Sequence, residues 1–236
     1  MIEGLASIAV FTENRTLWDH AIAMWNIRVP AYIYISDDGP THKPGPARCG
    51  KFSPYWYDQV VFNASVDGVS QETCRDFGHT AYGLAATFNV AETALIQGLD
   101  LYAPNLKRLT AAVALHTGLM DAGAADGWPK DPYHQPPLAV ARPLLCSGKN
   151  LTLGYSATYQ VALTGLERAG AADVAAAVNY TRSWVWKLGN PIGQFMYTCV
   201  HRCPPAVPTS ATLTNPPTRP RAPRRYEALT HGALAP

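Results

Sequence analysis

The sequence predicts an all-α protein whose helices form hairpins in an incomplete α/α toroid, with long loops at one end. Apolar residues recur at helical spacing in about six segments, and no segment alternates as a half-buried β-strand would. Clusters of Gly and Pro separate these segments and mark the loops. Of the 236 residues, 47% are apolar and 15% are charged, which suits one domain with a sizeable core.

The first two helices are predicted at residues 1–11 and from Asn14 to about Arg28. Asn14 is a suitable N-cap for the second helix, and Pro30 is expected to end it, because proline cannot donate a helical hydrogen bond. The first helix has no charged leader and no cleavage site, so we do not interpret it as a signal peptide. Because the sequence starts within an amphipathic helix, we expect it to begin inside its domain.

Two long loops, at residues 31–70 and 123–150, separate the remaining helices. Ordered loops of this length are more often functional than decorative. We assign residues 1–200 to the domain and residues 201–236, which are rich in Pro and Arg, to a flexible tail. The remaining helices are expected at residues 71–97, 106–122, 155–169 and 171–188, with Gly170 between the last two.

The helix predicted at residues 71–97 has one face rich in reactive groups. At about 100° per residue, its apolar side chains gather on one side and its polar side chains on the other. The polar side has no Lys, although a surface that serves only solubility would favour Lys and Glu. It offers a carboxylate, a guanidinium, an imidazole and a phenol at intervals of three or four residues, so neighbours can touch. The polar set is Gln71, Glu72, Arg75, Asp76, His79 and Tyr82, and the apolar set is Phe77, Ala81, Leu84, Phe88 and Leu95.

The composition excludes several classes of partner. A net charge of +2 offers no basic surface for nucleic acid, and no apolar run is long enough to cross a bilayer. Five cysteines form no paired metal-binding pattern, and their odd number argues against a disulfide framework. We therefore expect no metal ion and no cofactor. The sequence leaves the oligomeric state open.

Aromatic residues are plentiful, with 12 Tyr and 6 Trp. Most are expected to fill the core, but flat rings in a cleft can also stack on sugars. Trp56 and Tyr57, in the first long loop, are the candidates for such a substrate-binding platform.

The stretch that starts Gln71-Glu72-Thr73-Cys74-Arg75-Asp76 and the opening residues 1–11 are similar to parts of a known family. They resemble the alginate lyase domain family of polysaccharide lyases, and the resemblance covers roughly residues 1–120. It implies an incomplete α/α toroid that is secreted or periplasmic, with a cleft for an acidic polysaccharide. It also implies β-elimination at a uronic acid unit, with alginate or glucuronan as the substrate. The more specific stretch runs Gln71-Glu72-Thr73-Cys74-Arg75-Asp76-Phe77-Gly78-His79-Thr80 and continues through Ala91-Glu92-Thr93-Ala94 to Gln97-Gly98-Leu99-Asp100-Leu101-Tyr102. The other comprises residues 1–11, Trp18-Asp19 and Arg28-Val29-Pro30-Ala31-Tyr32-Ile33-Tyr34.

The resemblance also implies roles for particular residues. In related lyases an Arg and a Tyr seven positions later act in the cleft, and Arg75 and Tyr82 have that spacing. Members of the family also carry an Asn, often with a His, that helps to neutralise the substrate carboxylate. These groups lie in helices that would precede Met1. The resemblance therefore implies a partial domain, whose activity by itself is a question for experiment.

Elimination requires a base for the proton beside the uronate carboxylate, a neutralising group for the developing charge, and an acid for the leaving oxygen. We assign Arg75 to the substrate carboxylate or to favouring the phenolate of Tyr82. Tyr82 is the candidate acid, and the base is either Tyr82 or His79, which could instead neutralise the carboxylate. Gln71 is expected to bind the sugar, and Glu72 to orient Arg75.

The same residues have structural interpretations. Glu72 and Arg75 could be an ordinary surface ion pair, and His79 a structural histidine. We interpret three further histidines as structural, namely His116, His134 and His201.

Two other functions compete with the lyase hypothesis. A glycoside hydrolase would need two facing carboxylates, and the clustered acids are Asp67, Glu72 and Asp76. A non-catalytic binder of acidic glycans would need only the aromatic and Arg contacts.

Overall fold

The structure is a computed structural model that describes residues 1–44, 56, 59, 62, 66–125, 145–146 and 158–171. Within these residues the protein is helical, and the only β-type pairing is an isolated antiparallel bridge between Ile33 and Ser70. The all-α prediction is therefore confirmed for the described part. The helix expected at residues 171–188 and the tail at residues 201–236 lie outside it. None of the described helices combines the length and hydrophobicity needed to cross a bilayer.

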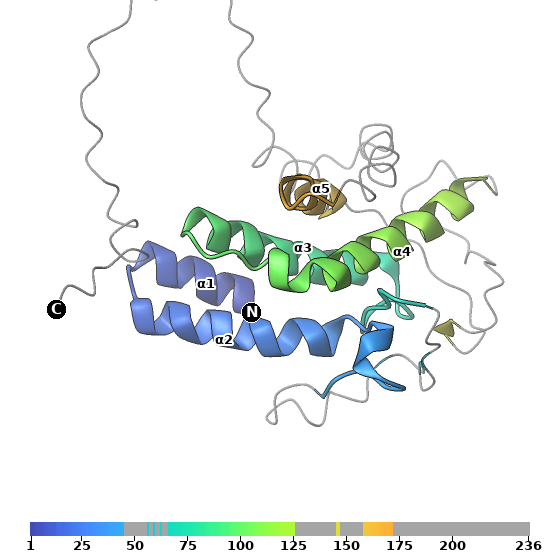
Figure 1. Cartoon of the computed structure of the whole chain (residues 1–236), viewed down its shortest axis with the longest axis horizontal. Helices are drawn as coiled ribbons and strands as arrows, with labels where there is room; N and C mark the ends of the chain where they lie inside the picture. The colour runs from blue at the N-terminus through green and yellow to red at the C-terminus, as the bar shows by residue number, and fades with distance from the viewer. Residues whose placement is uncertain are drawn as a thin grey trace, which may run out of the picture.

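The helix α3 is the centre of the arrangement. In Figure 1, α1 and α2 lie side by side, α3 lies against this hairpin, and α5 packs on the opposite side of α3. The helix α4 also contacts α5. The elements are α1 (Ile2–Phe11), α2 (Arg15–Tyr32), η1 (Ser36–Asp38), α3 (Phe77–Ile96), η3 (Ala103–Asn105), α4 (Leu106–Ala125) and α5 (Thr158–Arg168).

The helix α2 begins as predicted but ends later. The side-chain oxygen of Asn14 accepts the backbone N–H of Leu17 at 2.9 Å, so Asn14 is the N-cap. The prediction that Pro30 ends the helix is wrong, because α2 continues through Pro30 to Tyr32. Proline removes one backbone donor, but the buried side chain of Val29 and its neighbours hold this last turn against the core.

The helix α3 starts later than the periodicity predicts. The prediction that it opens at Gln71 is wrong, because Gln71 to Arg75 form turns and the first helical residue is Phe77. Asp76 is the N-cap, and its extended backbone breaks any helix that would run through it. The predicted end is correct, since Gly98 follows the helix with a φ of 84°.

The apolar side of α3 is buried as predicted. Phe77, Ala81, Leu84 and Phe88 are fully buried, and Leu95 is partly buried against the same cluster. Because α3 is covered by α1 and α2 on one side and by α5 on another, most of its length is internal. The polar side near its first turns reaches the surface at His79 and Tyr82, and the other end does so at Ile96.

Ionic contacts made by two buried carboxylates link the outer elements to this core. Glu92 on α3 accepts hydrogen bonds from Tyr102 at 2.8 Å and from Arg168 of α5 at 2.7 Å. Arg108 on α4 donates two bonds of 2.6 Å to the carboxylate of Asp38 in η1. Burial alone would raise the pKa of Asp38, but the bonds from Arg108 and from the backbone outweigh it and hold that pKa below its usual value.

Candidate functional site

The loop before α3 carries three of the predicted site residues, Gln71, Glu72 and Arg75. Because this loop is not helical, helical spacing does not set their positions, contrary to the prediction from periodicity. Its start is held by the backbone N–H of Gln71, which donates to the carbonyl of Tyr32 at 2.8 Å. Contacts with other segments therefore decide where these side chains lie.

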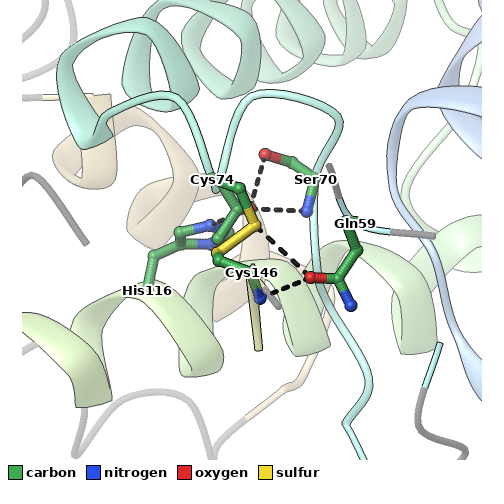
Figure 2. Close-up of a disulfide and its surroundings, with 6 residues drawn as sticks. Gln59, Ser70, Cys74, His116 and Cys146 are labelled. Carbon is green, nitrogen blue, oxygen red and sulfur yellow. Dashed lines mark hydrogen bonds between the residues drawn. A yellow bond between two sulfur atoms is a disulfide. The ribbon is translucent and has the colours of Figure 1, made fainter. Parts of the chain in front are cut away.

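A buried histidine on α4 anchors this loop from below (Figure 2). Nδ1 of His116 lies 2.7 Å from the carbonyl oxygen of Ala112, which can only accept, so Nδ1 carries the hydrogen. Nε2 therefore accepts from the hydroxyl of Thr73 at 2.8 Å, and Thr73 in turn accepts from the backbone N–H of Ser70 at 2.8 Å. Burial lowers the pKa of His116 to about 4. His116 is thus structural, as predicted.

A disulfide anchors the same loop from the side. Cys74 and Cys146 are bonded across a sequence separation of 72. The side-chain oxygen of Gln59 accepts the backbone N–H of Cys146 at 2.5 Å and lies 3.4 Å from the sulfur of Cys74. The sequence made only a weak case for disulfides, yet one forms here, because an odd number of cysteines excludes only complete pairing. Three segments distant in sequence thus meet immediately beside Arg75.

The carboxylate of Asp76 joins the loop to the start of α3. Its Oδ1 accepts the backbone N–H of His79 at 2.8 Å, and its Oδ2 lies 2.6 Å from Nδ1 of the His79 ring. The same Oδ2 lies 3.9 Å from Nε of Arg75. The side chains of Arg75 and His79 are 39% and 45% exposed, so this cluster is open to solvent.

Glu72 lies on the other side of the guanidinium. Its carboxylate is 3.5 Å from Nη1 of Arg75, which is the neighbour expected from the sequence. An exposed pair of this kind contributes only about 0–1 kcal/mol to stability. Its main consequence is positional, because Arg75 is held between two carboxylates.

Tyr82 lies on α3, three residues beyond His79, and is 63% exposed. Residues three apart on a helix are neighbours on its surface. Arg75, His79 and Tyr82 therefore form a continuous exposed row that starts in the loop and follows α3.

Gln71 connects this row to a groove between α1, α2 and α3. Its side-chain oxygen accepts a bond of 3.4 Å from Arg28, which lines the groove together with Tyr32 and Gly83. The groove has a volume of about 440 Å³ and a mainly apolar lining. Burial raises the pKa of Tyr32, and the charge of Glu72 raises it further, so Tyr32 is a neutral phenol.

Trp56, one of the two residues of the predicted aromatic platform, lies in the core. Trp56 is only 2% exposed, its ring stacks on His42 at a centroid distance of 4.8 Å, and it meets the edge of Phe62. The large apolar ring of Trp56 therefore packs in the core, where it offers no exposed face for stacking on a sugar. Tyr57 lies outside the described residues.

Two residues of the site had no assigned role in the lyase hypothesis: Arg28, and Asp76, which the sequence pattern places only on the polar face and among the clustered acids. Asp76 had a usable signal, because an Asp directly before an apolar helical pattern is a typical N-cap. Extending the helical pattern back to Gln71 hid that signal. No local sequence signal identified Arg28, because only the packing of α2 against the loop brings it to Gln71.

Within the described residues, no group of three or more His, Cys, Asp or Glu side chains could hold a metal ion. Comparison of the chain with protein-family models, with curated proteins and with solved structures finds no match. Functional inference must therefore come from the geometry and chemistry of the site.

Proposed function

We propose that the protein is a polysaccharide lyase, built on part of an α/α toroid, that cleaves a uronate polysaccharide such as alginate or glucuronan by β-elimination. The observation that supports this most is the exposed row of a guanidinium, an imidazole and a phenol. Arg75 and His79 share the carboxylate of Asp76, and Tyr82 lies one turn further along α3. These are the three kinds of group that elimination requires.

In this proposal the guanidinium of Arg75 binds the uronate carboxylate and neutralises the charge that develops there. The proton on the adjacent carbon passes to a base, His79 or Tyr82, and the electron pair of that C–H bond becomes a carbon–carbon double bond. The bond to the glycosidic oxygen breaks, and this oxygen takes a proton from the Tyr82 hydroxyl. Chain cleavage thus leaves an unsaturated uronate at the new end.

The geometry disfavours the glycoside hydrolase alternative. Hydrolysis needs one carboxyl group that can give a proton and a second one facing it. Asp76 is bonded to His79, Glu72 faces Arg75, and Asp67 accepts a backbone N–H at 2.6 Å. All three carboxylates are thus engaged by cationic or N–H groups of the protein, and none of these contacts leaves two of them facing each other as an acid and a partner.

The test is incubation with mannuronan, glucuronan and a neutral glucan, followed by ultraviolet absorbance of unsaturated ends and by a reducing-end assay. A lyase raises both signals on the uronates only. Reducing ends without absorbance would indicate hydrolysis, and binding without either signal would indicate a non-catalytic binder. Either of these two results would overturn the proposal.

Variants connect the activity to the row. Tyr82→Phe removes only a hydroxyl from an exposed side chain, so the fold should stay intact while kcat falls by roughly 10²–10⁴, the usual range for proton-transfer catalysis. Arg75→Lys should also lower activity, because an ammonium cannot bind a carboxylate as a fork. Arg15→Lys is the matched control, since Arg15 is exposed at the start of α2 and pairs with Asp19, which takes no part in the proposed reaction. Full activity in Tyr82→Phe would remove Tyr82 from the mechanism.

A further inference from the structure

The Asp76 carboxylate receives two hydrogen bonds from a single residue. Its Oδ1 binds the backbone N–H of His79, and its Oδ2 lies 2.6 Å from the ring nitrogen Nδ1. An ionised carboxylate can only accept, so the hydrogen in the second bond belongs to Nδ1. A neutral imidazole carries one hydrogen, and Nε2 of His79 is therefore left with a lone pair.

We propose that Asp76 is a positioning residue that fixes His79 in the Nδ1–H tautomer and so makes Nε2 the proton acceptor of the site. The tautomer follows from the hydrogen bonds alone, whereas the catalytic part of this inference rests on the proposed lyase function. Nε2 takes the proton from the carbon beside the uronate carboxylate, the C–H electron pair forms the double bond, and Tyr82 protonates the departing oxygen. The negative charge of Asp76 then stabilises the imidazolium, as in other carboxylate–histidine pairs.

The surroundings of the ring favour this arrangement. Arg75 lies 3.9 Å from the same Asp76 oxygen and keeps that carboxylate paired with positive charge. Glu72 faces Arg75 from the other side, and Tyr82 is the ionisable residue on the next turn of α3. From α2, the charged group of Arg28 reaches the loop and contacts Gln71 at 3.4 Å.

The substitution Asp76→Asn removes the negative charge but keeps an N-cap for α3. Asparagine is as good an N-cap as aspartate, so α3 should still start at the same residue. In the unaltered protein the two contacts of His79 use different oxygens of Asp76, and in Asp76→Asn an NH₂ group, which only donates, takes the place of the oxygen beside Nδ1. Both contacts persist only if the amide NH₂ donates to Nδ1, and this moves the ring hydrogen to Nε2. The substitution should therefore invert the tautomer.

The direct measurement is ¹⁵N NMR of the histidine rings in the full chain at mildly alkaline pH, with His79→Gln used to assign the signal. We expect hydrogen on Nδ1 in the unaltered protein and on Nε2 in Asp76→Asn. Asp100→Asn is the matched control, because Asp100 likewise accepts two N–H groups, at 2.8 and 3.1 Å, but both are backbone groups and not a histidine ring. Hydrogen on Nε2 in the unaltered protein, or the same tautomer in Asp76→Asn, would overturn the inference.

Kinetics then test the catalytic part. Asp76→Asn should lower kcat/KM on a uronate polymer by roughly 10²–10⁴, chiefly through kcat, and change the acid limb of its pH profile. Asp100→Asn should leave both unchanged. A normal kcat in Asp76→Asn with an inverted tautomer would show that His79 is not the base. Absence of lyase activity in the unaltered protein would instead defeat the proposed function and leave the tautomer assignment standing.

Discussion

Acidification should destabilise the protein through His116, the buried histidine under the candidate site. Burial lowers its pKa from 6.5 to about 4 in the folded state. Below pH 6.5 the unfolded chain binds a proton that the folded protein refuses, so stability is complete above that pH and falls towards pH 4. A shift of this size corresponds to a loss of about 3 kcal/mol, at a slope of about 1.4 kcal/mol per pH unit.

Urea unfolding, followed by tryptophan fluorescence across this pH range, measures the effect. The comparison is with His116→Gln, which keeps a hydrogen-bonding group but cannot titrate. The variant should be less stable at neutral pH, because the contacts to Thr73 and Ala112 are imperfect, but this loss does not depend on pH. The difference between the two unfolding free energies should therefore shrink as the pH falls.

His20→Gln is the control, because His20 lies exposed on α2 and meets water whether the chain is folded or not. The unfolding free energy of His20→Gln should depend on pH as that of the unaltered protein does. Asp38 adds a separate acid sensitivity: its pKa is held low by Arg108, so its contribution is present above pH 3.8 and is lost only at lower pH. Parallel curves for His116→Gln and the unaltered protein between pH 6.5 and 4 would refute the assignment of His116 as buried and neutral.

Two further predictions concern the packing around the site. Gly83→Ala should lower the melting temperature, because the added Cβ would overlap the hydroxyl of Tyr32 and overpacking costs about 1–3 kcal/mol. Gly118→Ala is the control: the space around its Cβ is open, so it should raise stability by up to about 1 kcal/mol. A change of the same sign in both variants would contradict this packing. Replacing both Cys74 and Cys146 by Ser should cost about 4 kcal/mol, because the bond closes a loop of 72 positions. Dithiothreitol should destabilise the unaltered protein by a similar amount, and an equal midpoint of unfolding with and without the bond would show that it contributes nothing.

Local sequence patterns predicted those features that depend only on neighbouring residues. Helical spacing of apolar residues located α1, α4 and the buried side of α3, because a helix places residues three and four apart on one face. Asn14 was recognised as an N-cap from its type and place alone. The predicted helix ends were less accurate. Pro30 lies inside α2 although proline usually ends a helix, and α3 starts after its N-cap Asp76 although the helical spacing extends back to Gln71.

The sequence by itself determined the helical character of the described part and the presence of an Arg, a His and a Tyr within one short stretch. Only the tertiary structure decided which side chains meet. The Cys74–Cys146 bond, the contact of Thr73 with His116 and the burial of Trp56 join segments far apart in the chain. Periodicity carries no information on such pairs, because they form when whole helices pack and not when a single helix winds.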